Sequence, residues 1–271
     1  MIITYNNENQ KFDEYFTETD IGFRTKNSQY IKNILVFIST IVSELNINID
    51  NDGIRIKAMD SGHISLIHSL IPTNLFETFN TDKQYVVGVN LSLMVQILNH
   101  LKPKDELIVI FGKNGEIKDS IEVIFLNDKY EKFYEFKLMN IDGEDYEVFE
   151  FEDTAKLTLD SKYFNEIIKD FVDIGDNLRI KILKDKSKIS FKTDGEMTNI
   201  KMILNNDKIK YENLKDICLE FNLKHINTFS KGYNIGQQIH LEIDNDLPIR
   251  MSFKISDGFL DYYLAPQIRD D

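Results

Sequence analysis

The sequence predicts an α+β protein built from two similar halves, each with antiparallel sheets and two helices. Apolar residues recur with the 3.6-residue helical period in residues 28–45 and again in residues 161–171. The segment Thr25-Lys-Asn-Ser-Gln-Tyr30 aligns with Thr158-Leu-Asp-Ser-Lys-Tyr163, at the start of the first helix of each half. Most other apolar segments are strand-like and separated by short turns, which favours antiparallel sheets with helices on one face.

The first half contains two expected helices. Asn27-Ser28 is an N-cap signal for a helix that we expect to reach about Leu45, and Asn90 caps a second helix through His100, before Pro103. Asn51-Asp52-Gly53 predicts a tight hairpin turn. The expected strands are 22–26, 46–50, 54–58, 63–71, 85–89, 107–111, 121–126 and 130–138.

The second half repeats this plan. Asp160-Ser161 caps a helix through Phe171, and a short helix is expected over residues 223–230. The expected strands are 156–159, 178–183, 188–192, 197–204, 217–221, 239–243, 249–255 and 259–264. We therefore expect a polar extension over residues 1–20, an N-terminal domain over 21–139, a connector over 140–153 and a C-terminal domain over 154–271. Tyr5, Phe12, Tyr15 and Phe16 could dock the extension locally.

Composition excludes several classes of function. A net charge of −13 opposes general adhesion to nucleic acid or acidic membranes, and no apolar run is long enough to span a bilayer, which predicts a soluble intracellular chain. The single cysteine, Cys218, lies in an apolar run and is expected to be a buried strand residue. The histidines lack metal-ligand spacing, and there is no phosphate loop or nucleophile motif. We expect neither an enzyme nor a cofactor or metal site.

The connector is strongly acidic. Seven acidic residues fall between Asp142 and Asp153, with Tyr146, Val148 and Phe149 among them. Such a run resists burial, so it is either a plain solvated linker or a surface segment that presents Tyr146 and Val148 to a partner.

Each expected helix packs its apolar face on a sheet and has a polar face that does not contact the sheet. Basic residues gather on these faces, mixed with Glu44, Glu166, Asp170 and Asp173. The basic residues are Lys32, Lys162, Lys169, Lys224 and Lys231, with His100 and Lys102 after the second helix. Lone helix lysines are most often plain solvated positions, but this segregation also fits contact with phosphates.

Several motifs are distributed along the chain: Ile56-Lys-Ala-Met-Asp-Ser-Gly-His-Ile-Ser-Leu-Ile67, Val87-Gly-Val-Asn-Leu91, Lys137-Leu-Met-Asn-Ile-Asp142, Ile174-Gly-Asp176, Phe253-Lys-Ile-Ser-Asp257 and Tyr262-Tyr-Leu-Ala-Pro266. With these motifs, the chain resembles the proliferating cell nuclear antigen family of sliding DNA clamps, in one order from residue 21 to residue 268. The resemblance implies a DNA-clamp fold: two duplicated domains per chain, and a homotrimeric ring around duplex DNA with helices lining the hole. It also implies a polymerase processivity factor for replication and repair, without catalytic activity.

The resemblance assigns roles to particular residues. Lys32, Lys169, Lys224 and Lys231 match channel lysines that touch DNA without reading its sequence, whereas Asn33, Ser39, Gln96, Asn99 and Glu166 stand where the family usually has further basic residues. The resemblance also implies a hydrophobic pocket for partner peptides of the PIP-box type beneath the connector. Its matching residues are Met59, His63, Leu66, Tyr146, Val148, Pro248, Tyr263, Ala265 and Pro266. On sequence alone, Met59, Leu66 and Pro248 would be ordinary core residues.

Subunit contacts are implied between two edge strands, residues 130–138 and 197–204. The interface residues are Tyr134, Phe136, Met197, Ile200 and Met202, and Lys184 matches a lysine that the family modifies with ubiquitin or a related protein. The implied partners are duplex DNA, DNA polymerase, an ATP-dependent clamp loader and further copies of the chain. The implied location is the nucleus or another site of DNA replication, which is cytoplasmic if the chain is viral, a possibility suggested by its high Asn, Ile and Lys usage.

Two alternatives stay open at this point. The chain could be one subunit of a heteromeric clamp, or an open monomeric or dimeric processivity factor that holds DNA by charge alone. The sparse basic lining weakens the second alternative.

Overall fold

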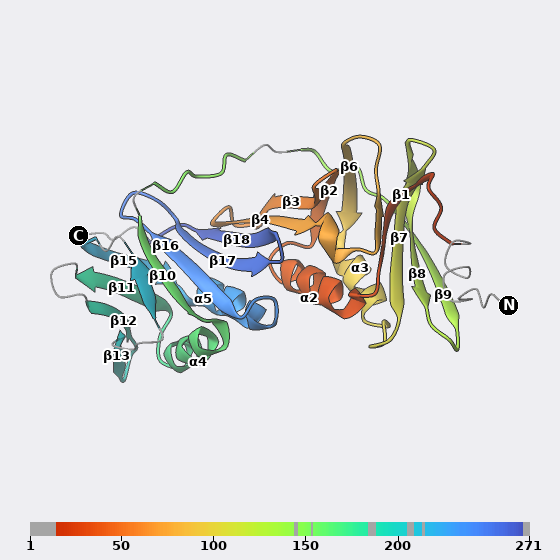
Figure 1. Cartoon of the computed structure of the whole chain (residues 1–271). Helices are drawn as coiled ribbons and strands as arrows, with labels where there is room; N and C mark the ends of the chain where they lie inside the picture. Colours follow the sequence, from red (N-terminus) through yellow and green to blue (C-terminus); the bar gives the residue numbers. More distant parts are fainter. Residues whose placement is uncertain are drawn as a thin grey trace, which may run out of the picture. The chain divides into compact units, whose positions relative to one another are not determined.

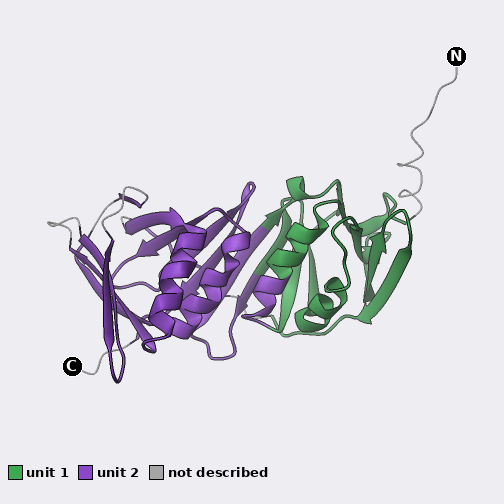
Figure 2. Cartoon of the chain, turned by 90° about the horizontal axis from the view of Figure 1, so that it is seen from below, with its two compact units in different colours: residues 1–35, 43–56, 71–143 green, residues 36–42, 57–70, 144–271 purple. Residues whose placement is uncertain are grey.

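The computed structural model describes residues 15–143, 146–152, 154–183, 188–204, 209–212 and 215–267 (Figure 1). The chain divides into two compact units, coloured separately in Figure 2. Unit 1 comprises residues 1–35, 43–56 and 71–143, and unit 2 comprises residues 36–42, 57–70 and 144–271. The domain boundaries inferred from the sequence stay a prediction.

Unit 1 is built on antiparallel strands. One sheet contains β1 (Asp20–Thr25), β5 (Thr78–Asn80), β7 (Glu106–Lys113), β8 (Glu116–Leu126) and β9 (Glu131–Lys137), in the spatial order β5-β1-β7-β8-β9. A second group contains β2 (Glu44–Asp50), β3 (Gly53–Met59) and β6 (Tyr85–Asn90), with β2 between the other two. The 3₁₀ turn η1 (Thr73–Leu75) precedes β5. The predicted Asn51-Asp52-Gly53 hairpin is confirmed, because Asp50 pairs with Gly53.

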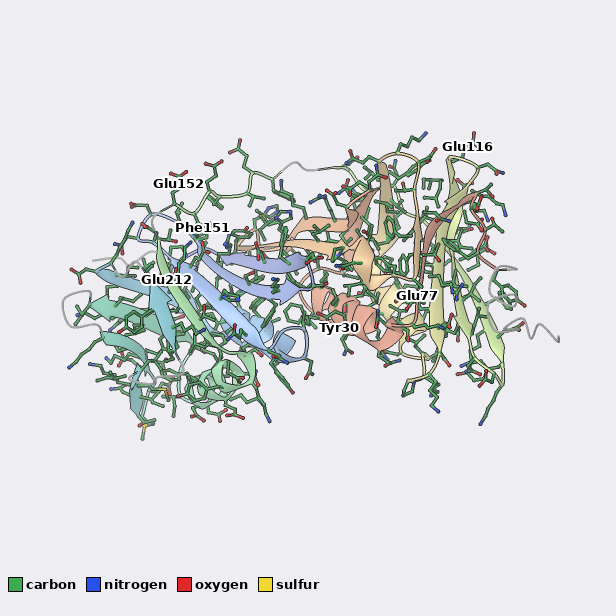
Figure 3. All side chains as sticks on the ribbon, in the orientation of Figure 1. Tyr30, Glu77, Glu116, Phe151, Glu152 and Glu212 are labelled. Atoms are coloured by element: carbon green, nitrogen blue, oxygen red, sulfur yellow. The ribbon has the colours of Figure 1, made fainter. Side chains whose placement is uncertain are left out.

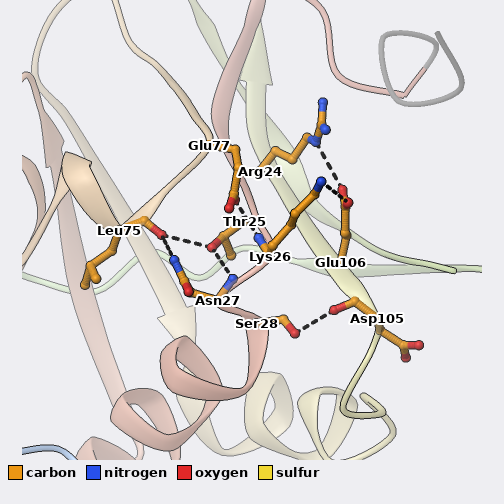
Figure 4. A network of polar contacts seen from close by, with 9 residues as sticks. All are labelled: Arg24, Thr25, Lys26, Asn27, Ser28, Leu75, Glu77, Asp105 and Glu106. Atoms are coloured by element: carbon orange, nitrogen blue, oxygen red, sulfur yellow. Dashed lines mark hydrogen bonds and ion pairs between the residues drawn. The ribbon is translucent and has the colours of Figure 1, made fainter. Parts of the chain in front are cut away.

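Helix α2 (Ser28–Ser39) begins where the sequence predicted. The polar network in Figure 4 holds this start: the Ser28 hydroxyl donates to the Asp105 carbonyl at 2.6 Å, and the Thr25 hydroxyl donates to the Leu75 carbonyl at 2.9 Å. The Arg24 guanidinium lies 3.2 Å from the Glu106 carboxylate in the same network. Ser28 therefore ties the helix to the loop before β7 and does not cap its own first turn.

The predicted end of this helix near Leu45 is wrong, since α2 ends at Ser39. The Thr40 amide donates to the Phe37 carbonyl at 3.0 Å, three residues back, and the Thr40 hydroxyl donates to the same carbonyl at 2.7 Å. This tight turn stops the helix. Val42, directly after this turn, and Leu45, in β2, are still buried, so the helical spacing of apolar residues extends beyond the helix itself. Helix α3 (Leu91–Leu98) also stops two residues short of His100.

Unit 2 contains two further groups of antiparallel strands. The first has the order β14-β10-β16-β17-β18-β4 and the second the order β13-β12-β11-β15. The bounds are β4 (Ser65–Pro72), β10 (Ala155–Asp160), β11 (Asn177–Leu183), β12 (Lys188–Asp194), β13 (Asn199–Leu204), β14 (Lys210–Glu212), β15 (Ile217–Asn222), β16 (Gln238–Ile243), β17 (Ile249–Ile255) and β18 (Gly258–Leu264).

Helices α4 (Ser161–Val172) and α5 (Leu223–Ser230) pack against each other in unit 2, and η3 (Lys231–Asn234) follows α5. The predicted Asp160 cap is confirmed, because its carboxylate accepts the Tyr163 amide at 2.8 Å. In the core, the Phe229 ring stacks on Phe253 and on Tyr262, with centroid distances of 4.8 and 5.1 Å. These contacts fix α5 on β17 and β18. Together, the two units confirm the predicted α+β fold of antiparallel sheets and paired helices.

Two local features differ from or extend the sequence analysis. Cys218 is exposed, so the prediction of a buried cysteine is wrong: β15 turns Ile217 and Phe221 inward, whereas Cys218 lies on the opposite face of the strand. Near the amino terminus, Phe16 is buried against Ile108, Ile110, Ile124 and Leu126 of β7 and β8. Tyr5 and Phe12 lie outside the described residues.

Over the described ranges, no helix has the length and apolar character needed to cross a membrane. The same part of the chain contains no group of His, Cys, Asp or Glu side chains arranged to hold a metal ion.

Candidate functional site

A cavity of about 1060 Å³ in unit 2 brings together every pocket residue predicted from the sequence. Those residues are Met59, His63, Leu66, Tyr146, Val148, Pro248, Tyr263, Ala265 and Pro266. Sequence reasoning missed the remaining lining residues, which are Ile64, Ser65, Glu147, Phe149, Glu150, Asn245, Asp246 and Leu247. Stretches that are far apart in the chain thus share one concave surface.

Strand pairing explains why these stretches meet. Leu66 on β4 pairs with Tyr263 on β18, and the Ala265 amide donates to the Ile64 carbonyl at 3.1 Å. Ile249, next to Pro248, pairs with Leu264 of β18. The floor of the cavity is therefore one side of neighbouring strands and their ends.

The loop between β3 and β4 is organised by Asp60. Its carboxylate accepts the Ile64 amide at 3.0 Å and the Ser65 amide at 2.6 Å, and His63 takes a positive φ of 52°. Burial opposes ionisation of this carboxyl, but the hydrogen bonds from Ser65 and Ile64 outweigh it and hold the pKa of Asp60 below its usual range. The carboxylate thereby presents His63 and Ile64 at the cavity.

The cavity has an apolar floor and a partly acidic rim. Leu66 and Tyr263 are buried, whereas Ile64 and Phe149 expose 46% and 47% of their surface. Glu147, Glu150 and Asp246 add carboxylates at the rim. An exposed apolar surface with an acidic border suits a peptide that carries apolar anchors and basic neighbours.

A polar layer lies behind Tyr263. Its hydroxyl donates to the Asp261 carboxylate at 3.3 Å, and Arg250 on β17 pairs with the Glu242 carboxylate at 2.6 Å. Burial raises the pKa of Asp261 above its ordinary value of 3.8, more than hydrogen bonding and Arg250 lower it.

This layer predicts a pH-dependent effect of Asp261→Asn on stability. Because the folded chain binds the Asp261 proton more tightly than the unfolded chain, the wild type loses stability as pH rises from the ordinary carboxyl pKa through the raised one. The variant should therefore have the larger free energy of unfolding at neutral pH, and this advantage should vanish in acid. Urea unfolding across pH measures it, with Asp170→Asn, on the exposed side of α4, as the matched charge control. A variant less stable than wild type at neutral pH would contradict the prediction.

The predicted DNA-facing lysines lie on helices. In unit 2, Lys162 and Lys169 on α4, Lys224 on α5 and Lys231 in η3 are all exposed. In unit 1, Lys32 on α2 is half-buried. In the described part of the chain, none of these lysines forms an ion pair, so their charges are available to a ligand.

The two predicted contact strands are both sheet edges. Among the described strands, β9 and β13 each pair on one side only. The centre of the Tyr134 ring lies 5.1 Å from the centre of the Phe125 ring and 6.0 Å from that of the His100 ring. Phe136 is only 7% exposed, so its side chain belongs to the core of unit 1 and its backbone alone reaches the edge.

On the second edge, Ile200 and Met202 are half-buried in β13. Met197 was predicted to begin this strand but lies before it and is 96% exposed, because the Gly195 amide bonds to the Thr198 carbonyl at 3.0 Å and forms a turn. Two exposed apolar residues on these strands, Phe133 and Ile203, were missed; their alternation with inward-facing neighbours was the available signal. Lys184 lies outside the described residues.

Comparisons with known proteins agree with the geometry. Residues 21–147 match the family model for the N-terminal domain of proliferating cell nuclear antigen, and residues 147–268 match the model for its C-terminal domain. The crystal structure of proliferating cellular nuclear antigen from Entamoeba histolytica is similar, with a TM-score of 0.84 and 27% sequence identity over 92% of this chain and 100% of that chain. The chain therefore belongs to the proliferating cell nuclear antigen family of sliding DNA clamps.

Proposed function

We propose that this protein encircles duplex DNA as a ring of three identical chains and tethers DNA polymerase and other replication and repair proteins through the cavity beneath the connector. The observation that carries the proposal is the convergence of separate stretches, from β4, β18 and the connector, on one apolar cavity. The protein itself catalyses nothing. An ATP-dependent loader places it on DNA at sites of replication, in the nucleus or in a viral replication compartment.

The cavity is suited to a short peptide of the PIP-box type. Ile64, Leu66 and Pro248 offer apolar contact, and Phe149 offers an exposed ring at the entrance. The carboxylates of Glu147, Glu150 and Asp246 would favour basic residues beside the apolar anchors. A peptide with aromatic and basic residues is therefore the expected ligand.

Ring closure would use the two sheet edges. A strand with one unpaired side is a template for unwanted association, and pairing β9 of one chain with β13 of the next removes both edges. Head-to-tail contacts of this kind close into a ring when the rotation between subunits permits it.

The lysines would contact phosphates without reading bases. Lys162, Lys169, Lys224 and Lys231 are exposed and unpaired within the described residues, and they lie on α4, α5 and η3. Since the chain carries a net charge of −13, such few contacts would hold DNA weakly. Enclosure, rather than affinity, would then keep the clamp on DNA.

The decisive experiment combines solution mass with retention on DNA. Sedimentation at several concentrations should give one species of three times the chain mass of 31.7 kDa. After loading, this species should remain on closed circular duplex and leave the same duplex once it is linearised. A persistent single chain would favour a heteromeric clamp subunit, and salt-sensitive binding to linear duplex by one or two chains would favour an open processivity factor.

Replacing two helix lysines tests the DNA contact. We expect Lys169→Ala with Lys231→Ala to reduce loading and retention while leaving ring assembly intact. Because each change occurs in all three chains, the ring loses up to about six lysines, and the slope of log affinity against log salt concentration should fall by about one for each phosphate contact that is lost. Salt titration on circular duplex measures this slope. Lys181→Ala with Lys254→Ala, on exposed strand positions of β11 and β17, is the matched control. Equal slopes for both double variants would exclude α4 and η3 from the DNA contact.

A further inference from the structure

The distal part of the connector, residues 146–152, is held by ring contacts. It has neither helix nor strand structure. The ring centres of Phe149 and Phe151 lie 6.5 and 5.9 Å from the ring centre of Tyr263. The guanidinium carbon of Arg250 lies 5.1 Å from the centre of the Phe151 ring. Phe151 is partly buried, whereas Glu152 beside it is exposed (Figure 3). The connector therefore rests on the sheet through its aromatic residues.

Arg250 is itself fixed to the sheet. It pairs across strands with Glu242 on β16 and with Tyr263 on β18. Its Nη2 donates to Glu242 Oε1 at 2.6 Å, and Lys156 Nζ lies 4.0 Å from the same oxygen. Glu242 is among the buried charged residues. The guanidinium that faces Phe151 is thus already held on one side by a carboxylate on a neighbouring strand.

Arg250 and Phe151 lie next to the cavity but do not line it. The connector residues that do line it are Tyr146–Glu150, directly before Phe151 in the chain. Residues 147–152 make no hydrogen bond with any other described residue, so ring contacts such as those of Phe149 and Phe151 help to determine where this part of the cavity wall lies. Loss of the Arg250 contact would release the wall from one end.

We propose that Arg250 and Phe151 form a latch that holds the connector wall over the cavity, which makes Arg250 a positioning residue for partner binding. This inference rests on the proposed partner-binding function of the same cavity. Peptides would meet a preformed wall and would not have to order it on binding. A cation over an aromatic face at a partly desolvated site contributes enough for about a fivefold change in affinity.

The test has two independent readouts. The first is the affinity of a fluorescein-labelled PIP-box-type peptide with aromatic and basic residues for the full chain. We expect about fivefold weaker binding to Arg250→Met and to Phe151→Leu, and no further loss in the double variant, because either change opens the same latch. Arg250→Lys and Phe151→Tyr, which keep a cation and a ring, should recover most of the affinity.

The second readout follows the connector without any peptide. The chain has no tryptophan, so Phe149→Trp introduces a single tryptophan beside Tyr263 whose emission can be excited selectively over that of the tyrosines. Adding Arg250→Met to this reporter should raise its acrylamide quenching about twofold. Arg179→Met is the matched control, because Arg179 pairs with the Glu220 carboxylate at 3.1 Å on strands away from the connector.

Arg250→Met leaves the buried Glu242 carboxylate without its closest cation, so Arg250→Met with Glu242→Gln is measured alongside it. Weaker binding and greater quenching in both backgrounds support the latch. Unchanged quenching, or additive losses in the double variant with Phe151→Leu, would overturn it. If the wild type binds no such peptide, the proposed partner function fails, and the quenching readout still decides the latch.

Discussion

Tyr263→Ala should weaken binding of PIP-box-type peptides by about 30-fold while the ring of three chains remains intact. The Tyr263 side chain lines the cavity, and its ring contacts those of Phe149 and Phe151. Its loss therefore removes part of the cavity floor and also the surface against which the connector packs. Truncation of a central buried aromatic commonly costs about 2 kcal/mol or more of binding free energy, which corresponds to this loss. Fluorescence anisotropy with a labelled peptide measures it.

Because Tyr263 is only 2% exposed, its truncation also leaves a cavity that destabilises unit 2. Val148→Ala is therefore the companion variant: Val148 lines the same cavity from the described connector residues 146–152, which are not part of a strand. We expect about fivefold weaker binding for this smaller change. Tyr211→Ala, at an exposed tyrosine of β14, is the control for loss of an aromatic ring. Unchanged affinity in both pocket variants would mean that the peptide site is elsewhere.

Ile200→Asp should convert the ring into single chains at micromolar concentration. Ile200 is half-buried on the edge strand β13, where the proposed contact with β9 of the next chain would bury it fully. A carboxylate enclosed there without a partner costs several kcal/mol of association free energy at each junction. Sedimentation measures the change as a shift from three chain masses to one.

Cys218→Asp provides a matched control for this variant. Cys218 is exposed on β15, at the opposite edge of the same sheet as β13, and receives the same new charge. The control should retain the mass of three chains. A ring that persists in Ile200→Asp, or that is lost equally in both variants, would contradict the proposed edge contact. Peptide affinity should be unaffected in either variant, because neither residue lines the cavity.

Local signals in the sequence were sufficient for much of the fold. The Asp160 cap, the Asn51-Asp52-Gly53 hairpin and the duplicated helix starts all depend on neighbours within a few residues, and each is present. The family motifs named nine of the residues that line the cavity but missed others, such as Ile64 and Phe149, that lie beside them in the chain.

Long-range packing accounts for what the sequence analysis missed. The spacing of apolar residues could not predict that α2 ends at Ser39, because Val42 and Leu45 continue the same spacing and are also buried. Turns and strands bury apolar residues as well as helices do. The exposure of Cys218 depends on which face of β15 is left open. Phe151 is far from Arg250 and Tyr263 in the sequence, and no local motif links the three residues. Only the pairing of β16, β17 and β18 beneath the connector brings their side chains together. Contacts between strands distant in the chain have no local pattern, so the residues that hold the cavity wall become visible only in the folded chain.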